Sequence, residues 1–190
     1  MAQHDTRSPD GKKRFQNPHE LLIEDKKNIG DLVLRAKLYP NVPHPKRKIR
    51  GMKKCKNNCH ECPYVQERKS VKAGKYTWSI NDQVDCETEN IIYLIQCNKE
   101  NCKQNRYVGE TERKARERIS EHRGYIYRNE KRFATGEHFN QPGHSLDNMT
   151  FTILEAVKKK DHLYRKEREI YHIRKLNFFH NGINKSLGGS

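Results

Sequence analysis

The chain has 190 residues, with 39 lysines and arginines against 24 aspartates and glutamates, and its formal charge is therefore +15. Only 33% of the residues are hydrophobic, which allows one modest core with polar extensions. No apolar run approaches the ~20 residues that span a bilayer and no signal-peptide pattern opens the chain, so we expect a soluble intracellular protein without a membrane partner. A basic excess of this size favours a polyanionic partner, with nucleic acid as the leading candidate.

Residues 1–54 are predicted to form a basic arm. Residues 28–38 begin at a plausible helix cap, Asn28, and carry apolar side chains at helical spacing, which predicts a short amphipathic helix. Residues 39–54 combine three prolines with a run of cations and predict an extended linker, which could follow a phosphate backbone or simply be solvated. The candidate DNA contacts in this linker are Lys46, Arg47, Lys48 and Arg50.

Residues 55–89 have little apolar content and contain four of the six cysteines. Because a reducing compartment disfavours disulfides, metal binding is the preferred interpretation. Cys55, Cys59 and Cys62 are spaced as C-x3-C-x2-C and need a fourth ligand, for which Cys86 is the first candidate and His60 the second. Such a segment is not expected to fold without a metal, so we predict a zinc knuckle that contacts DNA.

Residues 90–190 have the pattern of a compact α+β domain. In chain order the predicted elements are strands over 90–96 and 105–109, a helix over 112–129, a helical turn near 134–140, a strand over 149–157 and a helix over 161–176 capped by Asp161. The expected inward residues are Ala115, Ile119, His122 and Ile126 on the first helix and Leu163, Ile170 and Ile173 on the second. The expected fold is a small three-stranded sheet, antiparallel or mixed, flanked by helices.

Five polar residues of this domain could act together. Tyr93 and Tyr107 lie on neighbouring strands, and Arg118 and His122 share a helix face because they are four residues apart. Glu169, beside an apolar stripe, is either a solvated helix charge or a metal ligand. Phosphodiester hydrolysis needs a water, a proton acceptor, positive charge near the phosphate and usually a divalent cation. The five residues could supply these, although spacing alone does not prove that they converge.

The order of these motifs resembles the GIY-YIG nuclease family. The matching positions are Ile92-Tyr93, Tyr107-Val108-Gly109, Arg118, His122, Glu169 in "REIYHI" and Asn184 at the end of "GIN". More narrowly, "NIIYLIQC", "YVGET", "EHFNQPGHS" and "CHECPYV" are similar to the endonuclease domain of Penelope-like retroelements, and "NIGDLVLRAKL" is similar to what precedes that domain.

Three features depart from the family pattern: two residues and the length of one loop. Ile91 replaces the glycine of the first motif, and thirteen residues separate the two tyrosines, in a loop that contains Cys97 and Cys102. The aromatic residue usually found three positions after the glutamate is His172 here. Since that position mostly packs, its replacement concerns stability more than chemistry.

The resemblance implies a role for each matching residue. Glu169 should hold one Mg²⁺ or Mn²⁺. Tyr93 should act as general base or orient the attacking water, which requires Arg118 nearby to favour the phenolate, since the ordinary pKa of tyrosine is about 10. Arg118 should also bind the scissile phosphate, and Tyr107 should line the same pocket or only pack the hairpin.

Two further residues have open roles. His122 is expected to relay a proton or to contact phosphate, or else to lie on the surface. Asn184 is expected to tie the active site together by hydrogen bonds, or else to cap a turn.

The long loop between the tyrosines suggests a second zinc site. Cys97 and Cys102 are spaced as C-x4-C, and His138 and His144 as H-x5-H. They could meet if residues 134–140 pack over the hairpin turn, and the resemblance also implies this ligand set. The alternative is two free thiols and two surface histidines. With the knuckle, we predict about two zinc ions per chain.

The first long helix supplies further candidate DNA contacts, namely Arg113, Lys114, Arg116 and Arg123. Such residues position a duplex without reading its sequence, and a solvated helix surface explains many of them equally well. Specificity could reside in the zinc knuckle or in a partner domain.

The resemblance implies a nuclear enzyme that nicks chromosomal DNA and leaves a 3′-hydroxyl to prime reverse transcription. A reverse-transcriptase domain and the template RNA of the same element would then be partners, on a longer protein that contains this chain. A zinc-dependent nucleic-acid binding module without cleavage activity is the alternative. A redox-active cysteine protein is less favoured, because no cysteine pair begins a helix after a strand.

Overall fold

The computed structural model of the chain describes residues 49–73, 75–176 and 182–184. Contacts divide the chain into two units, 1–46 and 47–190, and the described residues belong to the second. The predicted helix over 28–38 lies outside the described residues, as do most of the predicted linker and its candidate DNA contacts Lys46, Arg47 and Lys48.

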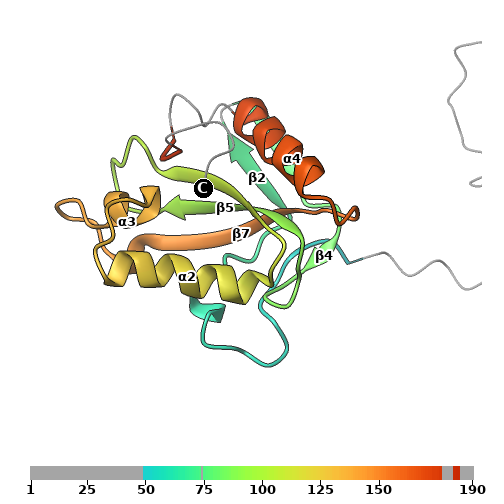
Figure 1. Cartoon of the computed structure of the whole chain (residues 1–190), viewed down its shortest axis with the longest axis horizontal. Helices are drawn as coiled ribbons and strands as arrows, with labels where there is room; N and C mark the ends of the chain where they lie inside the picture. Colours follow the sequence, from blue (N-terminus) through green and yellow to red (C-terminus); the bar gives the residue numbers. More distant parts are fainter. Residues whose placement is uncertain (1–48, 74, 177–181, 185–190) are drawn as a thin grey trace, which may run out of the picture. The chain divides into compact units, whose positions relative to one another are not determined.

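A three-stranded sheet forms the centre of the described unit (Figure 1). Strand β5 (Ile91–Cys97) lies in the middle, and it pairs antiparallel with β6 (Arg106–Thr111) and with β7 (Met149–Ala156). Nearly every residue of β5 is buried, as its β-branched and aromatic sequence predicts for a central strand. The three predicted strands are confirmed to within about two residues, and the sheet is antiparallel throughout.

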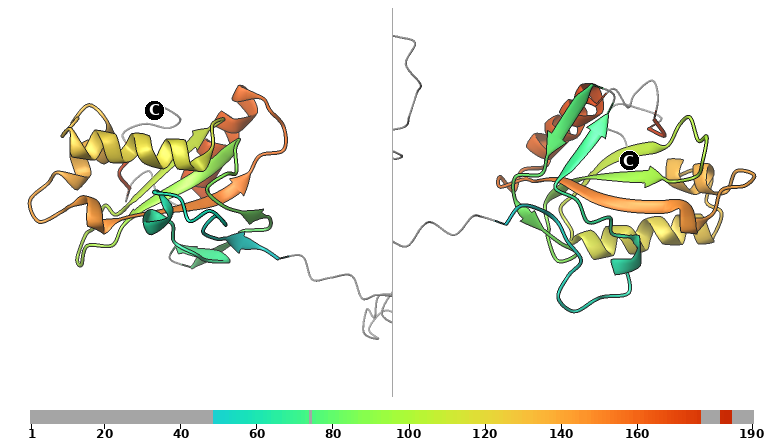
Figure 2. Two further views of the ribbon diagram at one scale, coloured as in Figure 1. Left: turned by 90° about the horizontal axis from the view of Figure 1, so that it is seen from below. Right: turned by 180° about the vertical axis from the view of Figure 1, so that it is seen from behind.

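Alternation along β5 sends its side chains into two hydrophobic clusters. Ile91, Tyr93 and Ile95 belong to the first cluster, together with residues of α2 (Ala115–Tyr127) and α3 (Ala134–Phe139). Ile92 and Leu94 belong to the second, together with residues at the end of α4 (His162–Lys175). Figure 2 shows from two further sides how the helices surround the sheet.

Helix α2 begins three residues later than predicted, because residues 112–114 form the turn that follows β6. Its inward residues Ala115, Ile119, His122 and Ile126 are all buried, as predicted. The N–H groups of Ala115 and Arg116 donate to the carbonyl oxygens of Thr88 and Cys86, each at 2.9 Å. The upstream cysteine segment therefore supplies the acceptors that the first turn of a helix lacks.

Helix α4 begins at the predicted cap, where the Asp161 side chain accepts from the backbone N–H groups of Leu163 and Tyr164. The prediction that Leu163 points inward is wrong, since its side chain is 72% exposed. Ile170 is half-buried and Ile173 is buried. The buried side of the helix is otherwise largely polar, with Arg165, Glu169 and His172. It faces carboxylates on the sheet, for Arg165 pairs with Glu110 at 2.8 Å and His172 with Glu155 at 2.8 Å.

The segment before the nuclease domain contains four short strands that the sequence pattern did not predict. β1 (Gly51–Met52) pairs with β4 (Gln83–Val84), and β2 (Ser70–Ala73) forms a hairpin with β3 (Tyr76–Ser79). Met52 is buried, so the predicted linker does not extend through this residue. Trp78 donates from its ring nitrogen to the carbonyl oxygen of Leu154 at 3.0 Å, which fixes the hairpin against β7.

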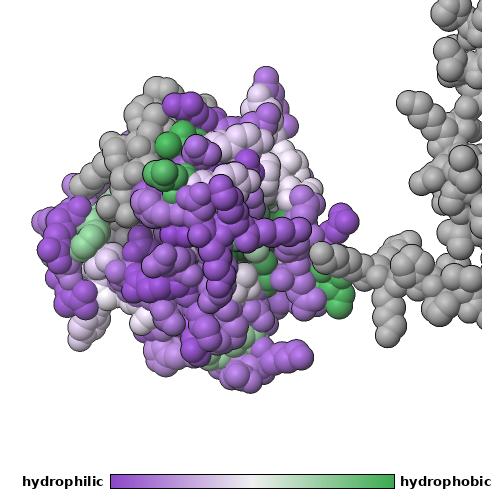
Figure 3. All heavy atoms as spheres, turned by 45° about the vertical axis from the view of Figure 1, so that its right-hand side comes forward, coloured by the Kyte–Doolittle hydropathy of each residue, from purple (hydrophilic) through white to green (hydrophobic). Residues whose placement is uncertain are grey.

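The surface agrees with the polar composition. The face turned forward in Figure 3 is mainly hydrophilic, with small apolar patches between charged side chains. None of the helices within the described ranges is long and apolar enough to cross a membrane.

Candidate active site and metal centres

The two motif tyrosines lie on the same face of the sheet. Tyr93 pairs with Gly109 and Ile95 with Tyr107, so the tyrosines are offset by one pleat, with ring centroids 6.3 Å apart. A Cβ atom on Gly109 would collide with the phenol of Tyr93. The glycine of the second motif therefore leaves the space in which the Tyr93 ring crosses β6.

Tyr93 is the centre of a buried hydrogen-bond network with α2. Arg118 Nε donates to the Tyr93 hydroxyl oxygen at 2.7 Å, and that hydroxyl lies 2.9 Å from His122 Nε2. His122 Nδ1 lies in turn 2.9 Å from the hydroxyl of Thr135 on α3. Since a guanidinium only donates, the Tyr93 oxygen accepts from Arg118 and its own proton is free to point to His122. The surface alternative for His122 is wrong, because the residue is 2% exposed.

Burial keeps the central pair of this network uncharged. Desolvation raises the pKa of Tyr93 well above its ordinary value, and neighbouring Tyr107 raises it further. Arg118 works to lower the pKa of Tyr93, as expected, but does not overcome burial. Desolvation and the charge of Arg118 lower the pKa of His122 well below 6.5. A neutral phenol therefore faces a neutral imidazole, which can accept its proton.

Arg118 is held by two partners. Burial works to lower its pKa, but Tyr93 and Glu121 raise it, so that the net shift is upward. Arg118 Nη1 lies 2.5 Å from Glu121 Oε2, and the Tyr125 hydroxyl donates to the other oxygen of Glu121 at 2.6 Å. Glu121 was not predicted, although its position three residues after Arg118 was a usable signal. Thr135 was also missed, and nothing local in the sequence connects it to His122.

Glu169 reaches the same region from α4. Its side chain is buried, and Oε2 has no hydrogen-bond partner among the described residues, although Lys166 Nζ lies 3.5 Å away. The pKa of Glu169 is raised by burial, although the charges of Lys166 and Arg118 work to lower it. Glu169 in turn raises the pKa of Tyr93 and of Tyr107. Glu169 is therefore not a solvated helix charge.

A hard divalent cation fits Glu169. Glu169 Oε2 accepts no hydrogen bond from the described residues and already has one cation, the Lys166 ammonium, 3.5 Å away, so the site attracts positive charge; Mg²⁺ commonly uses one or two carboxylates and keeps several waters. One carboxylate beside the network is thus an adequate donor set. Glu169 is the residue that would hold the ion.

Asn184 attaches the end of the described chain to β6. Its side-chain oxygen accepts from the N–H of Val108 at 2.9 Å, and its side-chain nitrogen donates to the carbonyl of Val108 at 2.7 Å. The N–H of Ile183 donates to the carbonyl of Arg106 at 2.6 Å. These bonds fix the backbone between Tyr107 and Gly109, and so the position of both motif residues.

Four cysteines converge as the first predicted zinc site. The Sγ atoms of Cys55, Cys59 and Cys86 lie 3.5, 3.7 and 3.7 Å from Sγ of Cys62, and all four lie within 4.8 Å of one another. Tetrahedral zinc with Zn–S bonds of ~2.3 Å requires sulfur atoms about 3.8 Å apart. Cys86 is thus the fourth candidate ligand. The alternative, His60, has a 79% exposed side chain and pairs with Arg123.

The acidity of these thiols differs with their surroundings. A hydrogen bond from the backbone N–H of Cys59 is the largest influence on Cys55, whose pKa falls to about 7. Burial raises the pKa of Cys86. Such a cluster of buried sulfur atoms fits a soft cation that binds thiolates.

The second predicted site also converges. Cys97, Cys102, His138 and His144 each offer an atom within 4.8 Å of the others. Cys102 Sγ lies 3.6 Å from His138 Nε2. Burial lowers the pKa of His138 to about 4, so the ring is neutral at pH 7, as a metal ligand must be. Both ring nitrogens of His144 are buried without a hydrogen-bond partner among the described residues, which fits a metal ligand better than a surface histidine.

The candidate DNA-contacting cations in α2 and in the turn before it are already paired with carboxylates. Arg113 lies 2.5 Å from Glu121, Lys114 and Arg116 each lie 3.0 Å from Glu87, and Arg123 lies 2.8 Å from Glu61. This pairing reduces the charge that they offer to DNA. Arg50 is exposed, and its contact with DNA stays a prediction, as do those of the α2 cations.

Comparison with known proteins identifies the domain. The family model described as the GIY-YIG catalytic domain matches residues 89–184, which is half of the chain. No curated protein and no solved structure matched the chain. The matched range contains the tyrosine network, Glu169 and Asn184 described above. The chain therefore belongs to the GIY-YIG catalytic-domain family, and its function is of the nuclease type, acting on DNA.

Proposed function

We propose that the protein is a metal-dependent endonuclease that nicks DNA by phosphodiester hydrolysis. The observation that carries this proposal is the buried network of Tyr93, Arg118 and His122 together with the buried carboxylate of Glu169, whose Oε2 accepts no hydrogen bond among the described residues and lies 3.5 Å from Lys166 Nζ. It supplies a proton acceptor, a fixed cation and a ligand for a divalent ion. These are the groups that phosphodiester hydrolysis requires.

The proton path follows from the hydrogen bonds. In the tautomer of His122 that carries its proton on Nδ1, the Tyr93 hydroxyl donates to Nε2 and Thr135 accepts from Nδ1. The attacking water gives a proton to the Tyr93 oxygen while the proton of Tyr93 moves to His122. The water oxygen bonds to phosphorus, the bond to the 3′-oxygen breaks, and that oxygen takes a proton from solvent.

Charge on the phosphate is balanced from two sides. Arg118 keeps its positive charge beside the reacting hydroxyl, where it stabilises the phosphate as negative charge develops. A Mg²⁺ or Mn²⁺ ion bound by Glu169 would add positive charge for the phosphate oxygens. Glu121 holds Arg118 in place from its other side.

We infer two zinc ions in addition, each with a structural role. Each cluster offers four protein ligands, and a site filled by four protein ligands has no open position for substrate. The four-cysteine set and the Cys₂His₂ set would therefore stabilise the fold rather than cleave DNA.

The biological task follows from the narrower resemblance. The similarity of "YVGET", "EHFNQPGHS" and "CHECPYV" to Penelope-like retroelements supports a nick whose 3′-hydroxyl primes reverse transcription. A reverse-transcriptase domain and the template RNA of the same element would be the partners. The enzyme would then act on chromosomal DNA in the nucleus.

The first experiment compares supercoiled plasmid cleavage by the protein with that by Glu169→Ala, in Mg²⁺ or Mn²⁺. Nicking should fall at least about a thousandfold in the variant, while DNA binding is retained, since loss of a metal ligand removes several kcal/mol of transition-state stabilisation. Glu167→Ala is the matched control, because this carboxylate lies exposed on the same helix.

Two outcomes would contradict the proposal. Nicking retained by a folded Glu169→Ala variant would remove the metal assignment, and binding without cleavage by either protein would favour a zinc-dependent binding module. A DNA polymerase added after nicking tests the priming role, because only a 3′-hydroxyl is extended.

A further inference from the structure

One exposed stripe of α4 alternates aromatic and cationic side chains. Tyr164, Arg168, Tyr171 and Lys175 follow one another at i, i+4, i+7 and i+11, so they lie on one side of the helix. The β2–β3 hairpin adds Tyr76 and Trp78 beside them. These six residues are called the aromatic–cation stripe. None of them belongs to the Tyr93–Arg118–His122 network.

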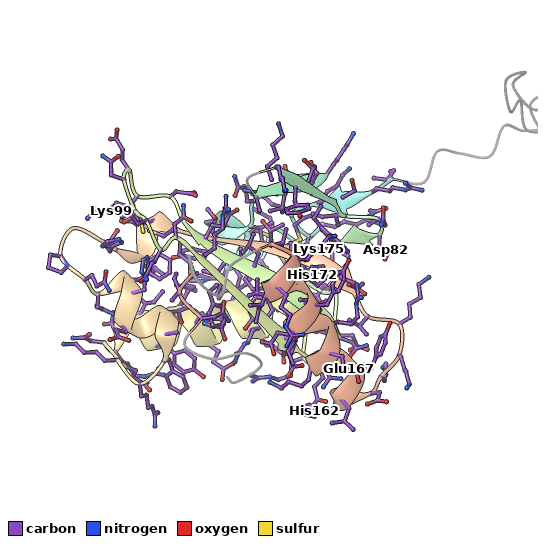
Figure 4. All side chains as sticks on the ribbon, turned by 90° about the horizontal axis from the view of Figure 1, so that it is seen from above. Asp82, Lys99, His162, Glu167, His172 and Lys175 are labelled. Atoms are coloured by element: carbon purple, nitrogen blue, oxygen red, sulfur yellow. The ribbon has the colours of Figure 1, made fainter. Side chains whose placement is uncertain are left out.

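The contacts confirm that the helix and the hairpin form one surface. The rings of Trp78 and Tyr171 have centroids 6.0 Å apart at an angle of 68°. Lys175 Nζ lies 5.2 Å from the ring centroid of Tyr76, and the guanidinium of Arg168 lies 4.4 Å from that of Tyr171. Figure 4 shows His172 and Lys175 toward one end of α4 and His162 at the other.

Aromatic exposure is concentrated on this stripe. Tyr76, Tyr164 and Tyr171 are 42%, 36% and 40% exposed. Tyr127 is the one other tyrosine, tryptophan or phenylalanine of the described residues that reaches such exposure. Exposed aromatic rings gathered in one place mark a binding surface more often than scattered ones do.

Two hollows border the stripe. The first, of about 520 Å³, is lined by Trp78, Tyr164, Arg168, Lys158 and Lys159 among others. The second, of about 630 Å³, is lined by Tyr171, Arg174 and Lys175 among others. Aromatic and cationic groups thus line both, together with the carboxylates Asp82 and Glu155 in the first and Glu167 in the second.

The charges favour an anionic ligand. Lys75, Lys158, Arg174 and Lys175 have no ion pair among the part of the chain that the structure describes. Arg168 and Lys159 are paired, with Glu155 and Asp161. Four uncompensated cations around exposed rings match a flexible polyanion with flat apolar groups.

We propose that the aromatic–cation stripe binds single-stranded DNA. Unpaired bases can stack on tyrosine and tryptophan rings while the cations contact the phosphates, and this combination is how proteins bind single strands without reading their sequence. Duplex DNA keeps the faces of its bases stacked inside, so it offers this stripe phosphates but no base to stack on the rings. DNA is the committed ligand because the chain belongs to a DNA-cleaving family.

The cations above the rings do not prevent stacking. Lysine is a flexible point charge, so the ammonium groups of Lys175 and Lys75 can leave the ring of Tyr76 for a phosphate while a base takes their place. The planar guanidinium of Arg168 can stay beside Tyr171 and stack as well.

Trp78 makes the test direct, because it is the only tryptophan of the chain. Oligo(dT) of about 12 nucleotides should quench the tryptophan emission of the full-length protein, and a duplex of equal length should quench it much less. Tyr171→Ala should weaken oligo(dT) binding about tenfold, as expected for one lost stacking platform. Tyr171→Phe should restore binding, because the ring is kept.

Tyr127→Ala is the matched control, since Tyr127 is an exposed tyrosine outside the stripe. This variant should bind oligo(dT) as tightly as the original protein does. Equal binding by Tyr171→Ala and Tyr127→Ala, or no quenching by oligo(dT), would overturn the proposal. Tighter binding of oligo(rU) than of oligo(dT) would overturn the assignment to DNA.

Plasmid nicking by Tyr171→Ala should be unchanged, because Tyr171 is outside the catalytic network. Since quenching needs no cleavage, the stripe is tested even if the protein does not nick DNA. A protein that nicks but is not quenched would refute the stripe alone.

Discussion

The four-cysteine cluster and the Cys₂His₂ cluster are both connected to the helix that carries Arg118 and His122, the first directly and the second through α3. The four-cysteine cluster acts through the backbone. The carbonyl of Cys86, itself a cluster member, accepts from the N–H of Arg116 at 2.9 Å, and the carbonyl of Thr88 accepts from the N–H of Ala115. The first turn of α2 is thereby fixed to the cluster.

The Cys₂His₂ cluster acts through a side chain. His138 and Thr135 lie on the same short helix, α3, less than one turn apart. The cluster positions α3 through His138, and the Thr135 hydroxyl lies 2.9 Å from Nδ1 of His122. This second cluster therefore bears on the orientation of the His122 ring.

The difference teaches how a small, polar chain can hold an active site. We infer that one cluster determines where α2 begins, and that the other determines how the His122 side chain of that helix points. Loss of the first should therefore unfold the site, whereas loss of the second should leave the helix in place and slow the reaction. The following experiments test this division.

Cys62→Ser should have the largest effect. Cys62 is fully buried and its Sγ contacts those of the other three cysteines of the cluster. We expect the zinc content to fall from about two ions per chain to one, with the free energy of unfolding lowered on the order of 5 kcal/mol or more and cleavage lost. Metal analysis and thermal unfolding check this.

His60→Ala is the control for that variant, because His60 is exposed and lies between two ligands in sequence. It should keep both zinc ions. A Cys62→Ser protein that unfolds at the original temperature would show that the cluster does not stabilise the helix.

His144→Ala should have the next largest effect. The second zinc ion should be lost or weakly held, the circular dichroism spectrum should change little, and cleavage should fall about 10- to 100-fold. Gln141→Ala changes an exposed residue of the same loop, and it should keep both the zinc content and the cleavage rate of the original protein. If cleavage were undiminished after loss of this zinc ion, the cluster would not control the orientation of His122.

Thr135→Val should lower the cleavage rate about tenfold without changing the zinc content, because valine keeps the shape but removes the hydroxyl next to His122 Nδ1. Thr135→Ser should restore the rate. If the lower rate came from altered packing and not from the lost hydroxyl, Thr135→Ser would also be slow, because serine lacks the methyl group of threonine.

The pH profile of cleavage tests the same group. In the proposed mechanism His122 must be neutral to accept the proton, and its pKa is lowered by burial. The rate of the original protein should therefore stay constant as the pH falls through 6.5, and decline only at lower pH. A decline centred at 6.5 or above would show that the ring is exposed during the reaction.

Arg123→Ala should have the smallest effect. Arg123 connects α2 to the cysteine segment through two interactions. It forms an ion pair with Glu61 at 2.8 Å, and its guanidinium lies 4.8 Å from the ring centroid of Tyr64 in a cation–π contact. We expect a loss of about 1 kcal/mol in the free energy of unfolding, measured by urea denaturation, and little change in DNA affinity. A large drop in DNA affinity would instead support the prediction that Arg123 contacts DNA.

Local sequence determined much of this protein. The apolar and β-branched run around Tyr93 predicts β5, the spacing of Ala115, Ile119 and Ile126 predicts α2, and the spacing of the cysteines and histidines predicts both clusters. These patterns are visible because strand alternation, helix periodicity and ligand spacing operate over a few residues.

Only the tertiary structure decided the rest, because it depends on which distant elements meet. Cys86 rather than His60 completes the first cluster, since the chain returns to it after 24 residues. Thr135 meets His122 across two helices, and Leu163 faces solvent because α4 turns its polar side to carboxylates on β6 and β7. Local spacing does not predict such contacts, because the residues that make them are far apart in sequence. They meet only when the helices and the cysteine and histidine clusters pack on the sheet.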